Sequence, residues 1–309
     1  MCYDYKMKRL LLFFLITTAF LCIASGCEPT QSPKIDGQIH IIATVFPVYD
    51  FARNIAGDRA EVSMLLPPSS DSHHYDPSPR DIIRIQECDI FLYIGGASDE
   101  WTEQVFSDSD NLTAVKLFDS VTLAEQEHSH GANDLYDEHI WTSPRNAVLM
   151  TRAILAALCA ADSGNAEFYE ENAENYIKEL EVLDRLFTDI ISEAKRDTVI
   201  FADRFPFRYF CEAYMLTSFA AFPGCSEESE PSAQTMAFLI EKIRNENIPV
   251  VFYGELSDKK TAASISRETG AETLLLHSCH TVSQSEMDSG ISYVELMKQN
   301  AENLKRALY

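Results

Sequence analysis

Residues 39–66 read IHIIATVFPVYDFARNIAGDRAEVSMLL, and this stretch decides the fold class. An apolar run rich in β-branched residues at 39–46 is followed by helical spacing of apolar residues at 48–56, and then by a second apolar run at 61–66. Apolar runs of strand length that alternate with helical patterns are typical of a parallel sheet covered by helices. The stretch therefore predicts an α/β architecture.

The same alternation continues along the chain and falls into two sets of strands. The first set is completed by DIFLYIG at 89–95 and TAVKLF at 113–118, with a helical pattern at 79–87. The second set consists of TVIFA at 198–202, SFAAF at 218–222, PVVFYG at 249–254 and ETLLL at 272–276. We expect two α/β lobes with mostly parallel sheets.

One long amphipathic helix is predicted between the two sets. Residues 165–196 contain neither proline nor glycine. Their apolar residues recur at steps of four and three: Tyr169, Ala173, Tyr176, Leu180, Leu183, Phe187, Ile190 and Ala194. At about 1.5 Å per residue the helix would be roughly 45 Å long, so we expect it to join both lobes. The alternative is the coiled-coil arm of a dimer.

Length and charge restrict the class of partner. A chain of 309 residues with 46% hydrophobic residues can bury a substantial core and favours two domains. The formal net charge of -23 repels nucleic acid phosphates, so we expect no nucleic acid partner. Acidic surfaces are usually solvated faces, and the charge alone does not predict a metal site. We expect a monomer.

The N-terminus has the pattern of a secretory signal peptide. Basic residues precede an apolar run at 10–23, which is shorter than the roughly 20 residues of a membrane span, and small residues at 24–26 precede Cys27. Cys27 resembles the lipidated cysteine of bacterial lipoproteins, although Ala24 stands where that motif usually has leucine. Ordinary cleavage and release is the alternative. Met7 is an alternative start to Met1.

These features predict five segments. They are a signal peptide (1–26), a lipidated cysteine and polar tether (27–37), an N-terminal lobe (38–162), a linking helix (163–196) and a C-terminal lobe (197–309). Besides Cys27, the mature chain would keep Cys88, Cys159, Cys211, Cys225 and Cys279. This odd number leaves at least one cysteine unpaired, and a disulfide between Cys211 and Cys225 is one of two outcomes that the sequence leaves open.

Five of the eight histidines lie in three loops that follow predicted strands or precede a predicted helix. They are His73, His74, His139, His277 and His280. Open α/β sheets bind their ligands at the carboxyl ends of their strands, and imidazoles that converge there suit zinc. A single histidine is more often a surface or hydrogen-bonded residue, but the combination favours a metal site. Candidates to bond the other ring nitrogens are Asp76, Glu138 and Glu255.

Five segments occur in order along the chain: ATVFPVYDFARNIAGD, LLPPSSDSHHYDPSPRD, DEHIWTSPRNA, FRYFCEAYML and GISYVELMKQNAENLKRAL. Together they resemble the zinc- and manganese-binding lipoproteins of bacterial ABC importers. The resemblance extends from about residue 39 to the C-terminus. It implies two Rossmann-like lobes joined by one long rigid helix, with a metal ion in the cleft between the lobes.

The resemblance also implies a set of metal ligands. His73, four residues before a proline, matches the first family ligand, and His139 in D-x-H-x-W matches the second. The third departs from the family, because FADRFPFRYF at 201–210 has no histidine and Asp203 is the nearest donor. His277 matches the fourth. The alternative ligands are His74, Cys279 and His280.

The implied function is zinc capture outside the cytoplasm of a bacterium and delivery to the membrane permease of a metal ABC transporter, with the protein held at the bilayer by a lipid anchor. Three nitrogen donors and one oxygen favour zinc over manganese. His128 and His130, between the first and second ligands, form either a weak metal-collecting loop or a plain acidic loop. The rival class is a zinc-dependent hydrolase, but no HExxH, G-x-S-x-G or P-loop motif occurs. We therefore expect no enzyme activity.

Overall fold

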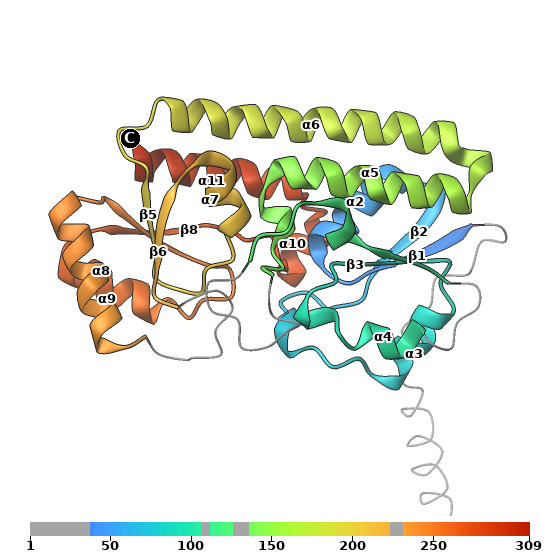
Figure 1. Cartoon of the computed structure of the whole chain (residues 1–309), viewed down its shortest axis with the longest axis horizontal. Helices are drawn as coiled ribbons and strands as arrows, with labels where there is room; N and C mark the ends of the chain where they lie inside the picture. The colour runs from blue at the N-terminus through green and yellow to red at the C-terminus, as the bar shows by residue number, and fades with distance from the viewer. Residues whose placement is uncertain (1–37, 107–111, 126–135, 223–230) are drawn as a thin grey trace, which may run out of the picture. The chain divides into compact units, whose positions relative to one another are not determined.

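Each predicted set of strands forms one four-stranded sheet in the computed structural model, which describes residues 38–106, 112–125, 136–222 and 231–309 (Figure 1). The first sheet has the order β2-β1-β3-β4, with β1 at Ile39–Ala43, β2 at Ala60–Met64, β3 at Ile90–Tyr93 and β4 at Thr113–Lys116. The second has the order β6-β5-β7-β8, with β5 at Thr198–Phe201, β6 at Thr217–Ala220, β7 at Val250–Tyr253 and β8 at Glu272–Leu275.

Every strand pair in both sheets is parallel, as the alternation of strands and helices predicted. Within one sheet the carboxyl ends of all strands therefore lie at the same edge. β1 pairs with β2 on one side and with β3 on the other, so the strand order reverses at β1. In open α/β sheets ligands bind at the carboxyl ends of the strands beside such a reversal. The loops after these strands are the place to look for a site.

The helices begin where the sequence places capping residues. Ser78, Ser283 and Ser292 each form a capping box with an acidic residue three positions later. The helices are α2 (Phe46–Ala56), α3 (Pro79–Gln86), α4 (Thr102–Phe106), α5 (Pro144–Ala161), α6 (Ala166–Ser192), α7 (Arg208–Tyr214), α8 (Ala233–Glu246), α9 (Lys260–Thr269), α10 (Gln284–Ser289) and α11 (Tyr293–Leu308).

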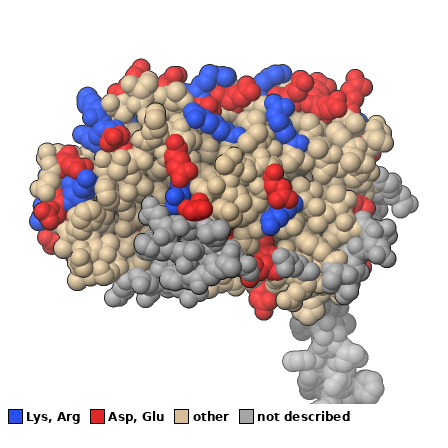
Figure 2. All heavy atoms as spheres, in the orientation of Figure 1, with Lys and Arg blue, Asp and Glu red and all other residues tan. Residues whose placement is uncertain are grey.

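The long helix α6 spans both halves of the described chain. It packs against α2 and α5, which belong to the first half, and against α7 and α11, which belong to the second (Figure 1). Its predicted stripe from Tyr169 to Ile190 is buried within the chain, so the coiled-coil alternative is wrong. The opposite side of the helix is exposed, and acidic and basic side chains gather over it (Figure 2).

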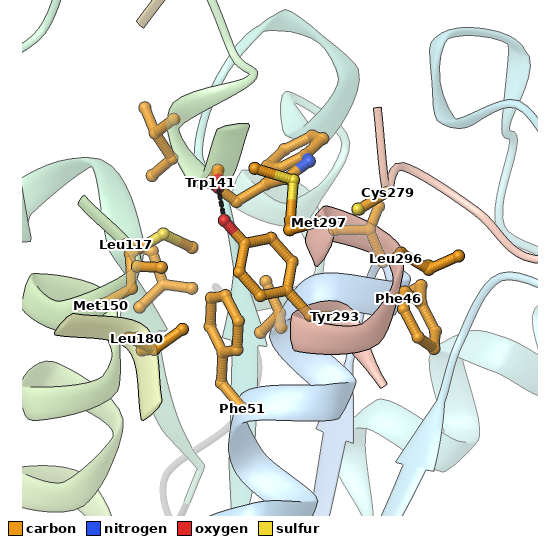
Figure 3. Close-up of a cluster of buried hydrophobic side chains, with 14 of the residues drawn as sticks. Phe46, Phe51, Leu117, Trp141, Met150, Leu180, Cys279, Tyr293, Leu296 and Met297 are labelled. Carbon is orange, nitrogen blue, oxygen red and sulfur yellow. Dashed lines mark hydrogen bonds between the residues drawn. The ribbon is translucent and has the colours of Figure 1, made fainter. Parts of the chain in front are cut away.

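A shared hydrophobic core joins the two halves. Phe51 of α2, Met150 of α5, Leu180 of α6 and Tyr293 of α11 pack together, and the Tyr293 hydroxyl donates to the Trp141 carbonyl oxygen at 2.7 Å (Figure 3). Burial of this many apolar side chains makes the hydrophobic effect the main stabilising term at the junction. Accordingly, Ile39–Tyr309 form one compact unit.

A second, smaller core lies under α8 and α9. It includes Ile200 of β5, Leu239 of α8 and Ile265 of α9. The second sheet is therefore covered on both faces, by α8 and α9 on one side and by the shared core on the other.

No single helix in the described ranges is long and apolar enough to cross a membrane; only α5 and α6, a pair bent by 115°, meet the length and composition criteria together. The buried thiol of Cys211 is free, while its proposed disulfide partner Cys225 lies outside the described residues. Cys27 and the other predicted features of residues 1–37 also lie outside them.

Candidate metal centre

Three histidines from three different loops converge at one point. His73, His139 and His280 each place a ring nitrogen within 4.8 Å of the others. Their ring centroids are 5.6 Å apart for His73 and His139, 5.4 Å for His73 and His280, and 5.7 Å for His139 and His280. Zinc holds imidazole nitrogens at about 2.0–2.1 Å, so a small contraction of the group would let all three bind one ion.

His73 is positioned by the loop that follows β2. Asp71 caps a short 3-10 helix at Ser72–His74, and its Oδ1 accepts the backbone N–H of His73 at 3.1 Å. The Nδ1 atom of His73 lies 2.8 Å from the Ser98 Oγ and 3.8 Å from the Glu138 Oε2. These contacts leave the Nε2 atom of His73 for the point of convergence.

The turn after β3 has to pass close to Glu138, and glycine makes this approach possible. A Cβ on Gly96 would lie 2.3 Å from the Cγ atom of Glu138. The Oε1 atom of Glu138 accepts the backbone N–H of Ser98 at 2.6 Å. The pair of glycines at 95–96 thus lets the turn hold Ser98 against His73.

His139 is fixed by its neighbour Asp137. The Oδ1 atom of Asp137 accepts the backbone N–H of His139 at 2.8 Å and lies 3.0 Å from its Nδ1 atom. Burial favours the neutral acid, but the hydrogen bonds and charge of His139 prevail and lower the pKa of Asp137. A carboxylate on Nδ1 orients the ring and directs Nε2 to a metal.

His280 reaches the group because the chain turns sharply after β8. Cys279 has a φ of 62°, in the left-handed region that non-glycine residues seldom adopt. Glu255 supports this turn, because its carboxylate accepts the backbone N–H of Ser278 at 2.9 Å and that of His280 at 3.2 Å. Trp141 ties the turn to the His139 loop, since its indole N–H donates to the Ser278 carbonyl oxygen at 2.8 Å.

The surroundings of His280 keep its ring neutral. Burial, followed by the nearby rings of His73 and His139, lowers the pKa of His280 well below its usual value, and Asp71 only partly opposes them. A neutral imidazole has a lone pair for a metal, so the ring is held in its binding form. The Ser72 Oγ, 2.5 Å from the Nε2 atom, is its hydrogen-bond partner.

The structure does not bring His277 into this group, in contrast to the expectation from the resemblance. Its Nδ1 atom accepts the Cys279 backbone N–H at 2.9 Å, and Asn300 bonds both its backbone N–H and its carbonyl oxygen. The ring is buried and used to build the turn. The left-handed residue between His277 and His280 reverses the chain, and this places the second histidine of HSCH, not the first, with His73 and His139.

Asp203 lies in the same pocket but outside the group of three. Its Oδ1 accepts the backbone N–H of Arg204 at 3.0 Å, and its buried Oδ2 has no hydrogen-bond partner among the described residues. A buried oxygen of this kind is suited to receive a metal ion or a metal-bound water. The pocket has a volume of about 350 Å³.

The remaining candidates lie elsewhere. His74 is exposed and pairs with Asp71 at 3.3 Å. The Cys279 thiol is buried beside the His277 carbonyl oxygen, and burial raises its pKa well above the usual value, which disfavours a thiolate ligand. Asp76 is exposed and does not line the pocket, whereas Glu138 and Glu255 do contact the site loops. His128 and His130 lie outside the described residues.

Sequence reasoning missed several residues of the site: Asp71, Ser72, Ser98 and Asp137. Asp137 had a usable signal, because it lies two residues before His139 in the motif. Asp71 had a similar signal, because it lies two residues before His73, whereas Ser72 and Ser98 had no local signal, because their contacts join loops that are far apart in the chain.

Comparisons with known proteins identify the family and the fold. The model of the family described as zinc-uptake complex component A, periplasmic, matches residues 41–307. The chain is 29% identical to the high-affinity zinc uptake system protein ZnuA of Bacillus subtilis, over 96% of each chain. Among solved structures, it is similar to the metal-dependent lipoprotein YcdH of Bacillus subtilis, with a TM-score of 0.78 and 30% identity, covering 88% of this chain and 99% of that one.

It is also similar to Zn(II)-bound AdcA of Streptococcus pneumoniae, with a TM-score of 0.76 and 28% identity. That match covers 88% of this chain and 58% of AdcA, so a further part of AdcA lies outside the match.

Proposed function

The chain belongs to the family of the periplasmic zinc-uptake complex component A, and from this premise we propose that His73, His139 and His280 bind its zinc ion. The family membership, the fold class and the function that the sequence predicted are confirmed. The protein is a zinc-binding component of an ABC importer, works with the permease of that importer, and is not an enzyme.

The observation that supports this site is the convergence of three ring nitrogens within 4.8 Å. Three imidazoles are a frequent donor set for zinc, whereas manganese prefers more oxygen donors. The proposed set replaces His277 with His280 and keeps His73 and His139 from the sequence-based prediction. Asp203 remains the candidate for the fourth position, either directly or through a water molecule, because it lines the same pocket and its Oδ2 is buried without a hydrogen-bond partner among the described residues.

The residues around the histidines orient the rings to bind a zinc ion without a chemical reaction. Asp137 and Ser98 occupy the Nδ1 atoms of His139 and His73, so both rings are oriented before the ion arrives. His280 is neutral because it is buried beside two other imidazoles. A preoriented, neutral donor set lowers the cost of ordering the site on binding.

The protein acts outside the cytoplasm, as its relatives do. We further propose that residues 1–26 are a cleaved signal peptide and that a lipid on Cys27, followed by the tether at 28–37, holds a monomer at the membrane. Support comes from the sequence pattern and from the relatives that are lipoproteins. Labelling of cells with a radioactive fatty acid tests the anchor: the wild-type chain should be labelled and Cys27→Ala should not.

Native mass spectrometry of the purified full-length protein tests the cargo. Apo protein in detergent is mixed with equal zinc and manganese, and the mass added to the chain is read. We expect one zinc per chain and no retained manganese. One manganese per chain, or no retained metal, would contradict the proposed site.

A further inference from the structure

We propose that the ion pair between Arg204 and Asp71 is a clasp across the zinc pocket that slows dissociation of the ion. The inference rests on the proposed zinc site. The Nη1 atom of Arg204 lies 3.0 Å from the Oδ2 atom of Asp71, although the two residues are 133 positions apart. Both residues line the pocket that contains His73, His139 and His280.

Asp71 connects the clasp directly to one proposed ligand. It is the cap of the short helix that carries His73, and its Oδ1 accepts the His73 backbone N–H. Its other oxygen, Oδ2, binds Arg204. Movement of the Asp71 carboxylate therefore displaces the backbone of His73 through one hydrogen bond.

Arg204 belongs to the other half of the chain. It follows Asp203 at the carboxyl end of β5, and its backbone N–H is held by the Asp203 Oδ1 at 3.0 Å. The end of β5 is itself anchored, since the Ala202 N–H donates to the Phe252 carbonyl oxygen at 2.8 Å and the Phe222 N–H donates to that of Asp203 at 3.4 Å. The clasp thus joins the loop after β2 in one sheet to a rigid turn after β5 in the other.

The clasp is more exposed than two of the other connections between the halves. The Trp141 indole bonds the Ser278 carbonyl in a buried position, and Asp50 bonds the Tyr293 N–H in the shared core. By contrast, the side chains of Arg204 and Asp71 are 34% and 25% exposed. Water can compete for a partly exposed pair, so the clasp can open while the buried contacts persist.

Release of the ion by separation of the two loops requires this pair to open, together with the buried hydrogen bond between Ser72 and His280. Zinc bound by His73 and His139 from the first half and by His280 from the second is freed when His73 separates from His280. That separation moves Asp71 away from Arg204. The clasp therefore resists the movement that releases zinc, and its loss should raise the dissociation rate.

Two substitutions distinguish the clasp from a plain charge effect. Arg204→Gln removes a positive charge near the ion, while Asp71→Asn removes a negative one but keeps a side-chain oxygen that can still cap the His73 N–H. Through-space electrostatics alone would make these variants change the zinc dissociation rate in opposite directions. Loss of a clasp makes both variants faster.

The experiment is a stopped-flow chase of the zinc-loaded full-length protein with excess chelator. It is followed by tryptophan fluorescence, because the Trp141 ring centroid lies 5.3 Å from that of His139. A partly exposed pair is worth up to about 1 kcal/mol, so we expect the dissociation rate to rise about 3- to 6-fold in each single variant. The double variant should be no faster than the faster single variant, and Arg204→Lys should restore part of the slow rate.

Arg145→Gln is the matched control, since Arg145 forms a partly exposed pair with Asp184 at 2.8 Å away from the zinc pocket. Its dissociation rate should equal that of the wild type, and thermal melts should show that all variants fold. Unchanged rates in both clasp variants, or rates that move in opposite directions, would overturn the clasp. A wild-type protein that holds no zinc would instead refute the proposed function, and the clasp with it.

Discussion

Replacement of Asp50 by alanine tests how the two halves of the protein are joined. The Asp50 carboxylate is fully buried beneath the shared core. It accepts hydrogen bonds from the Arg53 Nε at 2.8 Å, the Tyr176 hydroxyl at 2.9 Å and the Tyr293 backbone N–H at 3.0 Å. These donors belong to α2, α6 and α11, so one carboxylate connects an N-terminal helix, the long helix and the C-terminal helix.

The cost of the substitution follows from the donors that lose their acceptor. The Tyr176 hydroxyl and the Tyr293 N–H would be left buried without a partner, at about 1–3 kcal/mol each. Arg53 would lose less, because it also donates to the carbonyl oxygens of Gly290 and Ile291. We therefore expect Asp50→Ala to lower the free energy of unfolding by about 3–5 kcal/mol, in the range measured for broken buried ion pairs.

Chemical unfolding of the metal-free protein at neutral pH measures this loss through the denaturant midpoint. Tyr176→Phe removes only one of the three donors and should cost less than Asp50→Ala. Asp50→Asn keeps the shape but presents an amide N–H₂ to donors, and it should lie between the two. A loss below about 1 kcal/mol for Asp50→Ala would refute the reasoning, because it would mean that water or a rearranged acceptor satisfies these donors.

Three further predictions concern the site and the core. The pKa of His280 is lowered in the folded state, so the unfolded chain takes up a proton first as the pH falls below about 6.5. The metal-free protein should therefore melt at a lower temperature at pH 5 than at pH 7. This difference in melting temperature should be smaller in His280→Gln. Because Leu180 is fully buried, Leu180→Ala should lower the free energy of unfolding by about 2–5 kcal/mol, measured by denaturant unfolding. Gly96→Ala would place a Cβ 2.3 Å from the Glu138 Cγ, so calorimetric titration should show weaker zinc binding than in Gly254→Ala, where nothing lies within 4 Å.

The fold was largely predictable because it depends on local patterns. The period of apolar residues from Tyr169 to Ile190 predicted the long helix, and the structure buries that stripe. The helix begins at Ala166 and ends at Ser192, inside the predicted range of 165–196, because no apolar period marks its ends. The strands were recognisable because buried parallel strands form short continuous apolar runs.

The site was only partly predictable, because it depends on how distant loops meet. His73 and His139 lie in motifs that could be recognised in the sequence, and the structure brings them together. The choice between His277 and His280 depends on the backbone of Cys279, and no residue pattern predicts its φ of 62°. The contact between Asp71 and Arg204 joins residues from the two halves, and neither residue type nor spacing indicates it.

Zinc titration of two matched variants tests the proposed site most directly. In His277→Asn the new side-chain oxygen can still accept the Cys279 N–H, so we expect zinc affinity close to that of the wild type. His280→Asn removes a proposed ligand. Loss of a ligand's supporting partner alone typically weakens metal binding by about 10- to 100-fold, so we expect a loss of more than about 100-fold. Wild-type affinity in His280→Asn together with lost binding in His277→Asn would contradict the proposed site.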